Sequence, residues 1–258
     1  MRIYVCVKHV PDTAAKIVVR NKTEIDESVK FVINPYDEYA LEEALRLKEK
    51  FSGEVIVVML GKVSSMATLR LALAMGADRG ILVKCDQHLD HQTISKTLAK
   101  TISNDGKADI IFMGKQSVDA EGMQTPYLLA KNLDMPISTN VLSFSSDGTS
   151  SVIVESEGEG GLRTVIQMKL PCVVAAAKGL NHPRYPKLPD IMKAKTKPVK
   201  EIPFADLAIN PIASDHVASL LELELPPEKG QGIIYSGRAA KDMVANLVSD
   251  LQNKAQVI

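Results

Sequence analysis

The chain of 258 residues carries 31 basic and 31 acidic side chains, so its formal net charge is zero and no overall field would attract nucleic acid or an anionic membrane. Its three cysteines are far apart and form no Cys-x-x-Cys pair, which excludes a disulfide framework and suits a reducing compartment. No apolar run approaches the length of a membrane-spanning helix, and the N-terminus shows no signal-peptide pattern, so we expect a cytoplasmic protein without direct membrane insertion.

Short apolar strands alternate with amphipathic helices in the first half of the chain. We predict buried strands at residues 3–7, 55–59, 81–83 and 110–113, which are rich in Val, Ile, Leu and Met. Helices are predicted at residues 37–51, 64–75 and 91–103; Asp37 is the expected N-cap of the first, and Ser64 or Ser65 begins the second. This alternation predicts right-handed crossovers and a doubly wound parallel sheet.

The pattern changes after Pro136. Residues 141–144, 152–157 and 162–168 indicate antiparallel strands, and residues 172–177 form a further apolar strand. From Lys197 onward we expect irregular chain until a last helix at about residues 239–254. The predicted fold class is therefore α/β: a doubly wound, mostly parallel sheet with an antiparallel edge in residues 1–197, followed by a C-terminal arm at residues 198–258.

The loop after the strand at residues 110–113 is the strongest candidate for a ligand site. Ligands of doubly wound sheets bind outside the carboxyl ends of the strands. Thr125 as N-cap with Pro126 behind it predicts a helix start whose free N–H groups favour a phosphate, and two glycines allow the backbone to approach a ligand. A carboxylate repels phosphate, so the acidic members are assigned to ribose hydroxyls or backbone N–H groups. The candidate residues are Gly114, Lys115, Gln116, Ser117, Val118, Asp119, Ala120, Glu121, Gly122, Met123, Gln124 and Thr125.

Two further places should face the same crevice. The turn formed by Asn34, Pro35, Tyr36 and Asp37 leads into the first helix, and its Asn34 is placed to hydrogen-bond a base or a ribose. The strands that end near Cys6 and Leu60 would contribute backbone atoms rather than reactive groups. The alternatives are a plain turn with a helix cap at residues 34–37 and an ordinary long loop at residues 114–126 that binds nothing.

Motifs of several enzyme classes are absent from the sequence. No Gly-Lys pair has the earlier glycine that a Walker A loop requires, and no Gly-x-Gly-x-x-Gly joins a strand to a helix. His-Glu-x-x-His and Gly-x-Ser-x-Gly are also missing. The stretch from Cys85 to His91 is better explained as a solvated turn than as a metal site. We therefore expect no catalytic residue and no metal.

Residues 180–197 form a proline-punctuated segment that ends in alternating lysines. Pro183, Pro186 and Pro189 remove backbone donors and favour extended geometry, which predicts a stiff loop held out of the fold without a sheet partner. A proline-rich crossover is the alternative. An exposed apolar strip with a cationic flank is typical of a surface that meets another protein. The large side chains of this segment are Arg184, Tyr185, Leu188, Ile191 and Met192.

Together these motifs resemble the β subunit of electron-transfer flavoprotein. The resemblance spans most of the chain, with matching stretches at residues 34–35, 72–80, 114–116 and 160–162. Its most specific part is residues 180–195, which are similar to the family signature Leu-Asn-x-Pro-Arg-Tyr followed by Leu-Pro-x-Ile-Met-Lys-Ala-Lys. We therefore identify the chain, from its sequence, as a member of this family.

The resemblance implies a Rossmann-like fold of the adenine-nucleotide-binding type. It also implies an α subunit that makes most of the contacts to the redox-active FAD. Proteins of this family accept electrons from flavin dehydrogenases such as acyl-CoA dehydrogenases and pass them to a quinone oxidoreductase or another acceptor. The β subunit is an electron carrier rather than an enzyme, and in eukaryotes it lies in the mitochondrial matrix. The resemblance also implies a structural AMP held by the crevice residues named above.

Further roles follow from the same resemblance. The segment at residues 180–197 would dock dehydrogenases, with Leu188 as its apolar anchor and Lys193 and Lys195 beside it, and these lysines resemble ones that are methylated in some members. Glu157 occupies the position of an acidic residue that pairs with a mobile flavin domain, and residues 198–258 would pack on the partner subunit. Two alternatives remain open: an electron-bifurcating branch with a second FAD in the AMP crevice, and an adenine-nucleotide-dependent ligase or pyrophosphatase of similar fold.

Overall fold

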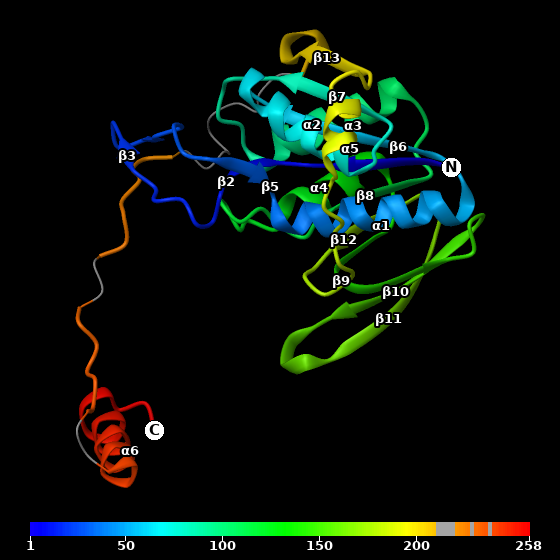
Figure 1. Cartoon of the computed structure of the whole chain (residues 1–258). Coiled ribbons are helices and arrows are strands. Elements are labelled where there is room, and N and C mark those ends of the chain that lie inside the picture. The colour runs from blue at the N-terminus through cyan, green and yellow to red at the C-terminus, as the bar shows by residue number, and fades with distance from the viewer. Residues whose placement is uncertain (210–219, 228–229, 237–238) are drawn as a thin grey trace.

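A nine-stranded sheet forms the centre of the structure, a computed structural model that describes residues 1–209, 220–227, 230–236 and 239–258 (Figure 1). The strands lie in the order β11-β10-β9-β12-β8-β1-β6-β7-β13. Their bounds are β1 (Arg2–Cys6), β6 (Glu54–Gly61), β7 (Arg79–Lys84), β8 (Ile110–Gly114), β9 (Ile137–Ser146), β10 (Ser151–Glu157), β11 (Arg163–Lys169), β12 (Cys172–Ala176) and β13 (Val199–Pro203).

Every neighbouring pair from β9 through β13 in this order is parallel, whereas β10 and β11 add an antiparallel edge beside β9. The chain passes from β1 through β6 to β7 on one side and then returns to β8 on the other side of β1. This reversal is the switch point at which doubly wound sheets bind ligands. The α/β fold class predicted from the sequence is therefore confirmed.

Helices cover both faces of the sheet. On one face lie α1 (Pro35–Phe51) and α2 (Met66–Met75), which pack on side chains such as Val5 and Phe112; on the other lie α3 (His91–Asp105) and α4 (Gln124–Leu133), which pack on Tyr4 and Ile111. Each of these strand side chains is fully buried. Because successive residues of a strand point to opposite faces, an uninterrupted apolar run is what a doubly covered strand requires.

Two helix starts differ from the sequence prediction. In α1 the N-cap is Asn34 and Pro35 occupies the first turn, so Asp37 lies inside the helix and the expectation that it is the cap is wrong. In α4 the N-cap is Met123, whose backbone is left-handed, so the helix begins at Gln124 and the expected cap at Thr125 is also wrong. At both helices the chain turns into the helix earlier than the cap-forming side chains indicated.

The segment at residues 180–197 is less extended than predicted. It contains the helix α5 (Leu188–Ala194), in which Pro189 lies in the first turn, where no intrahelical N–H bond is required. The expectation of an irregular chain after Lys197 is wrong for the next residues, because β13 pairs in parallel with β7 and is followed by the 3-10 turn η3 (Phe204–Leu207). Further 3-10 turns are η1 (Val63–Ser65) and η2 (Glu159–Gly161).

The remainder of the predicted C-terminal arm lies largely outside the sheet. The helix α6 (Ala240–Asp250) and the following π-helical turn η5 (Leu251–Ala255) bury no residue and stand apart from the sheet in Figure 1. Residues 210–219, 228–229 and 237–238 of this arm are outside the described residues.

Short strands that the sequence did not predict pair as β2 (His9–Pro11) with β5 (Phe31–Ile33) and β3 (Val19–Arg20) with β4 (Glu24–Ile25). None of the helices in the described ranges has both the length and the apolar character needed to cross a membrane.

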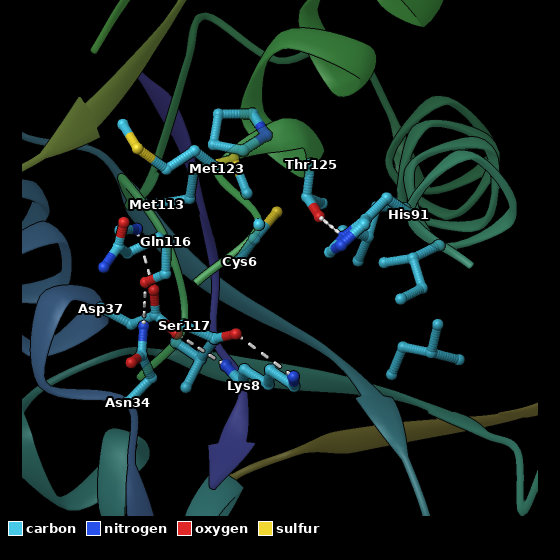
Figure 2. A pocket seen from close by; sticks show the side chains of 17 residues that line it. Cys6, Lys8, Asn34, Asp37, His91, Met113, Gln116, Ser117, Met123 and Thr125 are labelled. Carbon is cyan, nitrogen blue, oxygen red and sulfur yellow. Dashed lines mark hydrogen bonds between the residues drawn. The ribbon is translucent and has the colours of Figure 1, made fainter. Parts of the chain in front are cut away.

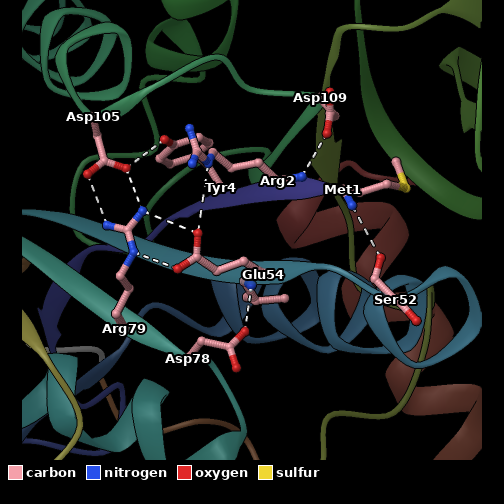
Figure 3. A network of polar contacts seen from close by, with 10 residues as sticks. Met1, Arg2, Tyr4, Ser52, Glu54, Asp78, Arg79, Asp105 and Asp109 are labelled. Carbon is pink, nitrogen blue, oxygen red and sulfur yellow. Dashed lines mark hydrogen bonds and ion pairs between the residues drawn. The ribbon is translucent and has the colours of Figure 1, made fainter.

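An ion-pair network closes the amino ends of the parallel strands (Figure 3). The guanidinium of Arg79 donates to Glu54 Oε1 at 2.7 Å and to Asp105 Oδ2 at 2.7 Å, and the Tyr4 hydroxyl donates to Asp105 at 2.7 Å. The hydrogen bonds to Asp105 raise the pKa of Arg79 above its ordinary value. The carboxylate of Asp105 is only 11% exposed, so the Arg79 charge offsets most of the cost of burying it.

Arg79→Gln should therefore destabilise the fold. We expect the free energy of unfolding, measured by urea denaturation, to fall by about 1–3 kcal/mol, because Asp105 loses its charge partner while remaining buried. Arg163→Gln is the matched control: its ion pair with Glu155 is on the surface, where the Arg163 side chain is 61% exposed, and its loss should change the stability by less than about 0.5 kcal/mol. Equal effects of the two substitutions would contradict the role assigned to Arg79.

Candidate functional site

A crevice opens at the carboxyl ends of β1 and β8, at the switch point of the sheet (Figure 2). The space between its walls, counted together with the open mouth, is about 720 Å³. The walls come from the ends of β1, β6 and β8, the starts of α1 and α3, and the loop between β8 and α4. The position agrees with the one predicted from the strand order.

Asp37 ties these elements together. Its two carboxylate oxygens accept hydrogen bonds from the backbone N–H groups of Lys8 and Gly114, both at 2.8 Å. The side chain thus joins the chain just after β1 to the last residue of β8. Gly114 must lack a side chain here, because a Cβ atom would lie 2.5 Å from Asp37 Oδ1. Burial raises the pKa of Asp37 to about 7, although the two N–H donors act to lower it.

Asn34 shapes the loop that follows β8. Its side-chain amide donates to the carbonyl oxygen of Gln116 at 2.9 Å, and its Oδ1 accepts from the backbone N–H of Val118 at 3.1 Å. The side chain is almost fully buried. Because the amide nitrogen and the oxygen both have partners in the loop, Asn34 acts in this structure as a loop support, where the sequence indicated a contact to a base or a ribose.

Lys8 reaches across the mouth of the crevice. Its ammonium group donates to Ser117 Oγ at 3.3 Å and to Asp119 Oδ1 at 2.8 Å. The sequence predicts only backbone atoms from this strand end. A lysine directly after a buried strand, with a carboxylate in the facing loop, is a signal that could have indicated a side-chain role.

The wall opposite Lys8 is formed by α3. The ring of His91, the first residue of this helix, lies 3.1 Å from Thr125 Oγ1 through Nδ1, and a Cβ atom on Gly122 would lie 2.5 Å from His91 Nε2. Ile94 and Leu98 continue this wall with apolar side chains. The sequence predicts a helix here but not a site, because only the place of these residues at the open end of the sheet brings them into the crevice.

The chemistry of the crevice favours binding over catalysis. Cys6, Met113 and Met123 provide an apolar, polarisable lining, and burial raises the pKa of the Cys6 thiol, which therefore stays protonated and unreactive. The start of α4 presents free backbone N–H groups and the positive end of the helix dipole. An apolar floor beside such a helix start suits a flat heterocycle that carries a phosphate.

The structure brings only part of the predicted residue set to this crevice. The predicted residues that line it are Cys6, Asn34, Asp37, Leu60, Gly114, Gln116, Ser117, Gly122, Met123 and Thr125. The predicted residues that do not line it are Pro35, Tyr36, Lys115, Val118, Asp119, Ala120, Glu121 and Gln124. The lining residues that the sequence analysis did not select are Val7, Lys8, His91, Ile94, Leu98, Met113 and Pro126.

The predicted partner-binding residues lie elsewhere. Tyr185, Leu188, Ile191 and Met192 are exposed around α5, as are Lys193 and Lys195. Arg184 is half-buried against α1, and Glu157 is exposed at the end of β10 on the antiparallel edge. Across the ranges that the structure describes, no group of three or more His, Cys, Asp or Glu side chains is arranged to hold a metal ion.

Comparisons with known proteins agree on one family. The family model described as the electron transfer flavoprotein domain matches residues 23–207. The electron transfer flavoprotein subunit beta of Bacillus subtilis (strain 168) is 37% identical over 261 residues, with 100% of both chains covered. The mitochondrial subunit beta of Arabidopsis thaliana is 40% identical over 262 residues, also with 100% of both chains covered. The human subunit beta is 39% identical over 254 residues, with 96% of each chain covered.

Asp37→Asn should remove a pH dependence of stability. The folded-state pKa of Asp37, about 7, lies above the ordinary value of about 3.9, so its contribution to stability is complete below about pH 4 and is lost as the pH rises through about 7. We expect the free energy of unfolding of the native chain, minus that of the variant, to fall by roughly 4 kcal/mol from pH 4 to pH 8. Urea denaturation across this range measures the difference. A constant difference would mean that the Lys8 and Gly114 N–H groups keep the carboxylate ionised throughout.

Proposed function

The chain belongs to the electron transfer flavoprotein family as a β subunit, and on this premise we propose that it pairs with an α subunit to accept electrons from flavin dehydrogenases of the acyl-CoA dehydrogenase type. In this proposal the heterodimer passes the electrons to a quinone oxidoreductase or another acceptor. The observation that carries it is the identity of 37–40% to named subunits over the whole chain. The chain then works as a cytoplasmic carrier, or in the mitochondrial matrix of a eukaryote, rather than as a free-standing enzyme.

The crevice at the switch point is the proposed site of a structural AMP. Its apolar lining of Cys6, Met113 and Met123 suits an adenine ring, and the start of α4 suits the phosphate. The Lys8–Asp119 ion pair lies at the mouth and adds a cationic group beside the loop. The Cys6 thiol of the lining is buried and protonated, so it would not act as a nucleophile toward a bound nucleotide.

The redox-active FAD is proposed to lie mainly on the α subunit, with this chain forming one wall around it. Two parts of the chain support such a pairing. The apolar side chains of Val244, Leu247 and Val248 on α6 are exposed, as expected of a surface that a partner buries. Glu157 is exposed on the antiparallel edge, where its charge is free to meet a cationic group of the flavin domain.

We further propose that the surface around α5 docks the dehydrogenase. The Leu188 side chain is 73% exposed and Met192 is 56% exposed, and Lys193 and Lys195 flank them. An exposed leucine and methionine beside two exposed lysines resemble the anchor of a protein interface. The cationic flank would select an acidic rim on the partner.

Identification of the bound nucleotides tests the first part of the proposal. The chain is coexpressed with its natural α subunit, the heterodimer is denatured, and the released nucleotides are separated by chromatography. We expect about one FAD and one AMP per heterodimer, since the FAD is proposed to lie mainly on the α subunit and the AMP in the crevice of this chain. Two FAD molecules without AMP would establish the bifurcating alternative, and the absence of both nucleotides would contradict the proposal.

A pair of substitutions to valine assigns the AMP to this crevice. Gly122→Val places methyl groups against His91 inside the crevice and should remove most of the AMP while leaving the FAD. Ala14→Val is the control, because Ala14 is exposed, does not line the crevice and lies outside the arm proposed to pack on the α subunit. Equal AMP content in both variants would place the nucleotide elsewhere.

Leu188→Ala tests the docking surface. The substitution removes most of an exposed apolar anchor, so the second-order rate of electron transfer from the dehydrogenase should fall by about tenfold while the FAD and AMP content stays unchanged. Val18→Ala, at an exposed position outside the docking surface, is the control and should leave the rate unchanged. Identical transfer kinetics of the two variants would remove the docking role.

A further inference from the structure

Arg184 fastens the docking surface to α1. Its Nε and Nη2 atoms donate to the two carboxylate oxygens of Glu42 at 2.8 and 3.0 Å, and its Nη1 donates to Glu49 Oε1 at 2.6 Å. The backbone N–H of Arg184 also donates to Glu42, at 3.1 Å. All three guanidinium nitrogens therefore have acceptors on α1, so this side chain has little hydrogen-bonding capacity left for a partner protein.

The acceptor of this ion pair is itself held rigidly. The Glu42 side chain is only 4% exposed and also accepts from Arg46 Nε at 2.9 Å. Burial acts to raise the pKa of Glu42, but the hydrogen bonds from Arg184 and Arg46 outweigh it and the pKa is lowered. A buried carboxylate between two guanidinium groups fixes the position of both.

A second anchor lies three residues earlier. The Asn181 side chain is buried and donates to the Tyr39 carbonyl oxygen and to Glu43 Oε2, both at 2.9 Å. Consecutive acidic residues of α1, Glu42 and Glu43, therefore bind two residues of the same segment. The hydrogen bonds of Asn181 and Arg184 therefore fix the start of the docking surface relative to α1.

The other end of the docking surface is fastened to α2. Arg70 Nη1 donates to the carbonyl oxygens of Ala194 and Lys197 at 2.8 and 2.6 Å. The ammonium group of Lys197 donates in turn to the carbonyl oxygens of Leu73 and Ala77, at 2.9 and 2.6 Å. The two cations thus donate to carbonyl groups at the ends of α5 and α2 and in the chain just beyond them.

Between these anchors the apolar side chains are displayed without cover. Tyr185 is 95% exposed and Leu188 is 73% exposed, whereas Ala194 behind them is buried. A surface that is ordered before the partner arrives pays no conformational entropy on binding, which raises the affinity without adding a contact. The order of the docking surface therefore depends on the hydrogen bonds that attach its two ends to α1 and α2.

We propose that Arg184 is a positioning residue for dehydrogenase recognition: its ion pairs with Glu42 and Glu49 hold the docking surface in the orientation that the dehydrogenase binds. The inference rests on the proposed docking function of the surface around Leu188. It assigns the arginine of the signature to the intramolecular support of that surface, and the docking contacts to its exposed apolar neighbours.

Arg184→Gln and Arg46→Gln form a matched pair of variants. Each removes one guanidinium group from the same Glu42 carboxylate, but only Arg184 belongs to the docking segment. Both are prepared as FAD-loaded heterodimers and assayed with a purified acyl-CoA dehydrogenase and its substrate. Arg184→Gln should raise the KM for the heterodimer about tenfold with kcat within about twofold, whereas Arg46→Gln should leave both near the native values.

Hydrogen exchange separates positioning from direct contact. In the free heterodimer, peptides covering residues 185–195 should exchange faster in Arg184→Gln than in the native protein or in Arg46→Gln. A raised KM with unchanged exchange would make Arg184 a docking contact and overturn the proposal. Arg184→Lys keeps the charge but cannot bridge two carboxylates, so its KM should stay raised; a native KM would mean that charge alone is recognised, and would also overturn it.

Two further variants keep the outcome decisive. If Arg184→Gln fails to assemble, Glu49→Gln replaces it, because Glu49 is 58% exposed and its loss removes half of the anchor without disturbing the core; a KM raised about threefold with faster exchange supports the proposal, and native values overturn it. Leu188→Ala distinguishes the docking function of the surface from the positioning role of Arg184. If it leaves the KM unchanged, the docking function itself is wrong; if it raises the KM while Arg184→Gln behaves as Arg46→Gln, only the positioning role is wrong.

Discussion

The hydrogen bonds of the buried Asp37 carboxylate are the interaction on which the site depends. They join the backbone N–H groups of Lys8 and Gly114, which lie at the ends of two adjacent strands, to the first turn of α1. Without this acceptor, the N–H groups of Lys8 and Gly114 would lose their hydrogen-bond partner on α1, and the crevice would keep only the support that Asn34 gives to the same elements. The position of the carboxylate also explains why the residue after Met113 is a glycine, since a Cβ atom would occupy the space of the acceptor.

The same helix carries the second functional surface. Further along α1, Glu42 and Glu43 hold the segment that leads to α5, so the crevice and the proposed docking surface share one rigid element. A helix with buried acidic residues at several positions is expensive to fold unless every charge has a donor. Here one donor, Arg46, lies on α1 itself and the others come from the two strand ends and from residues 181–184, so the electrostatic cost of α1 is offset mainly by the contacts that give the two surfaces their geometry.

Much of the fold was predictable because apolar strand runs, helix periodicity and glycine stops are local properties. The parallel core, its antiparallel edge and the place of the crevice follow from strand order and from the rule that ligands bind at the switch point. The errors have physical causes. The sequence predicts extended chain at Pro189, but the first turn of a helix tolerates proline. It predicts Thr125 as a cap, but the left-handed backbone of Met123 starts the helix earlier. The strand β13 is short and pairs with a partner more than a hundred residues away, which no local pattern records.

The sequence by itself determined the family, the α/β class and the loop after β8 as the candidate ligand site, because these depend on motifs and on the order of strands along the chain. Only the tertiary structure decided what each polar side chain does there. In the structure Asn34 supports the loop after β8, Lys8 lies at the crevice mouth, and Arg184 forms ion pairs with α1. The reason is that a polar group acts on whatever donor or acceptor lies within about 3 Å of it, and for residues distant in sequence that neighbour is set by the packing of the whole chain.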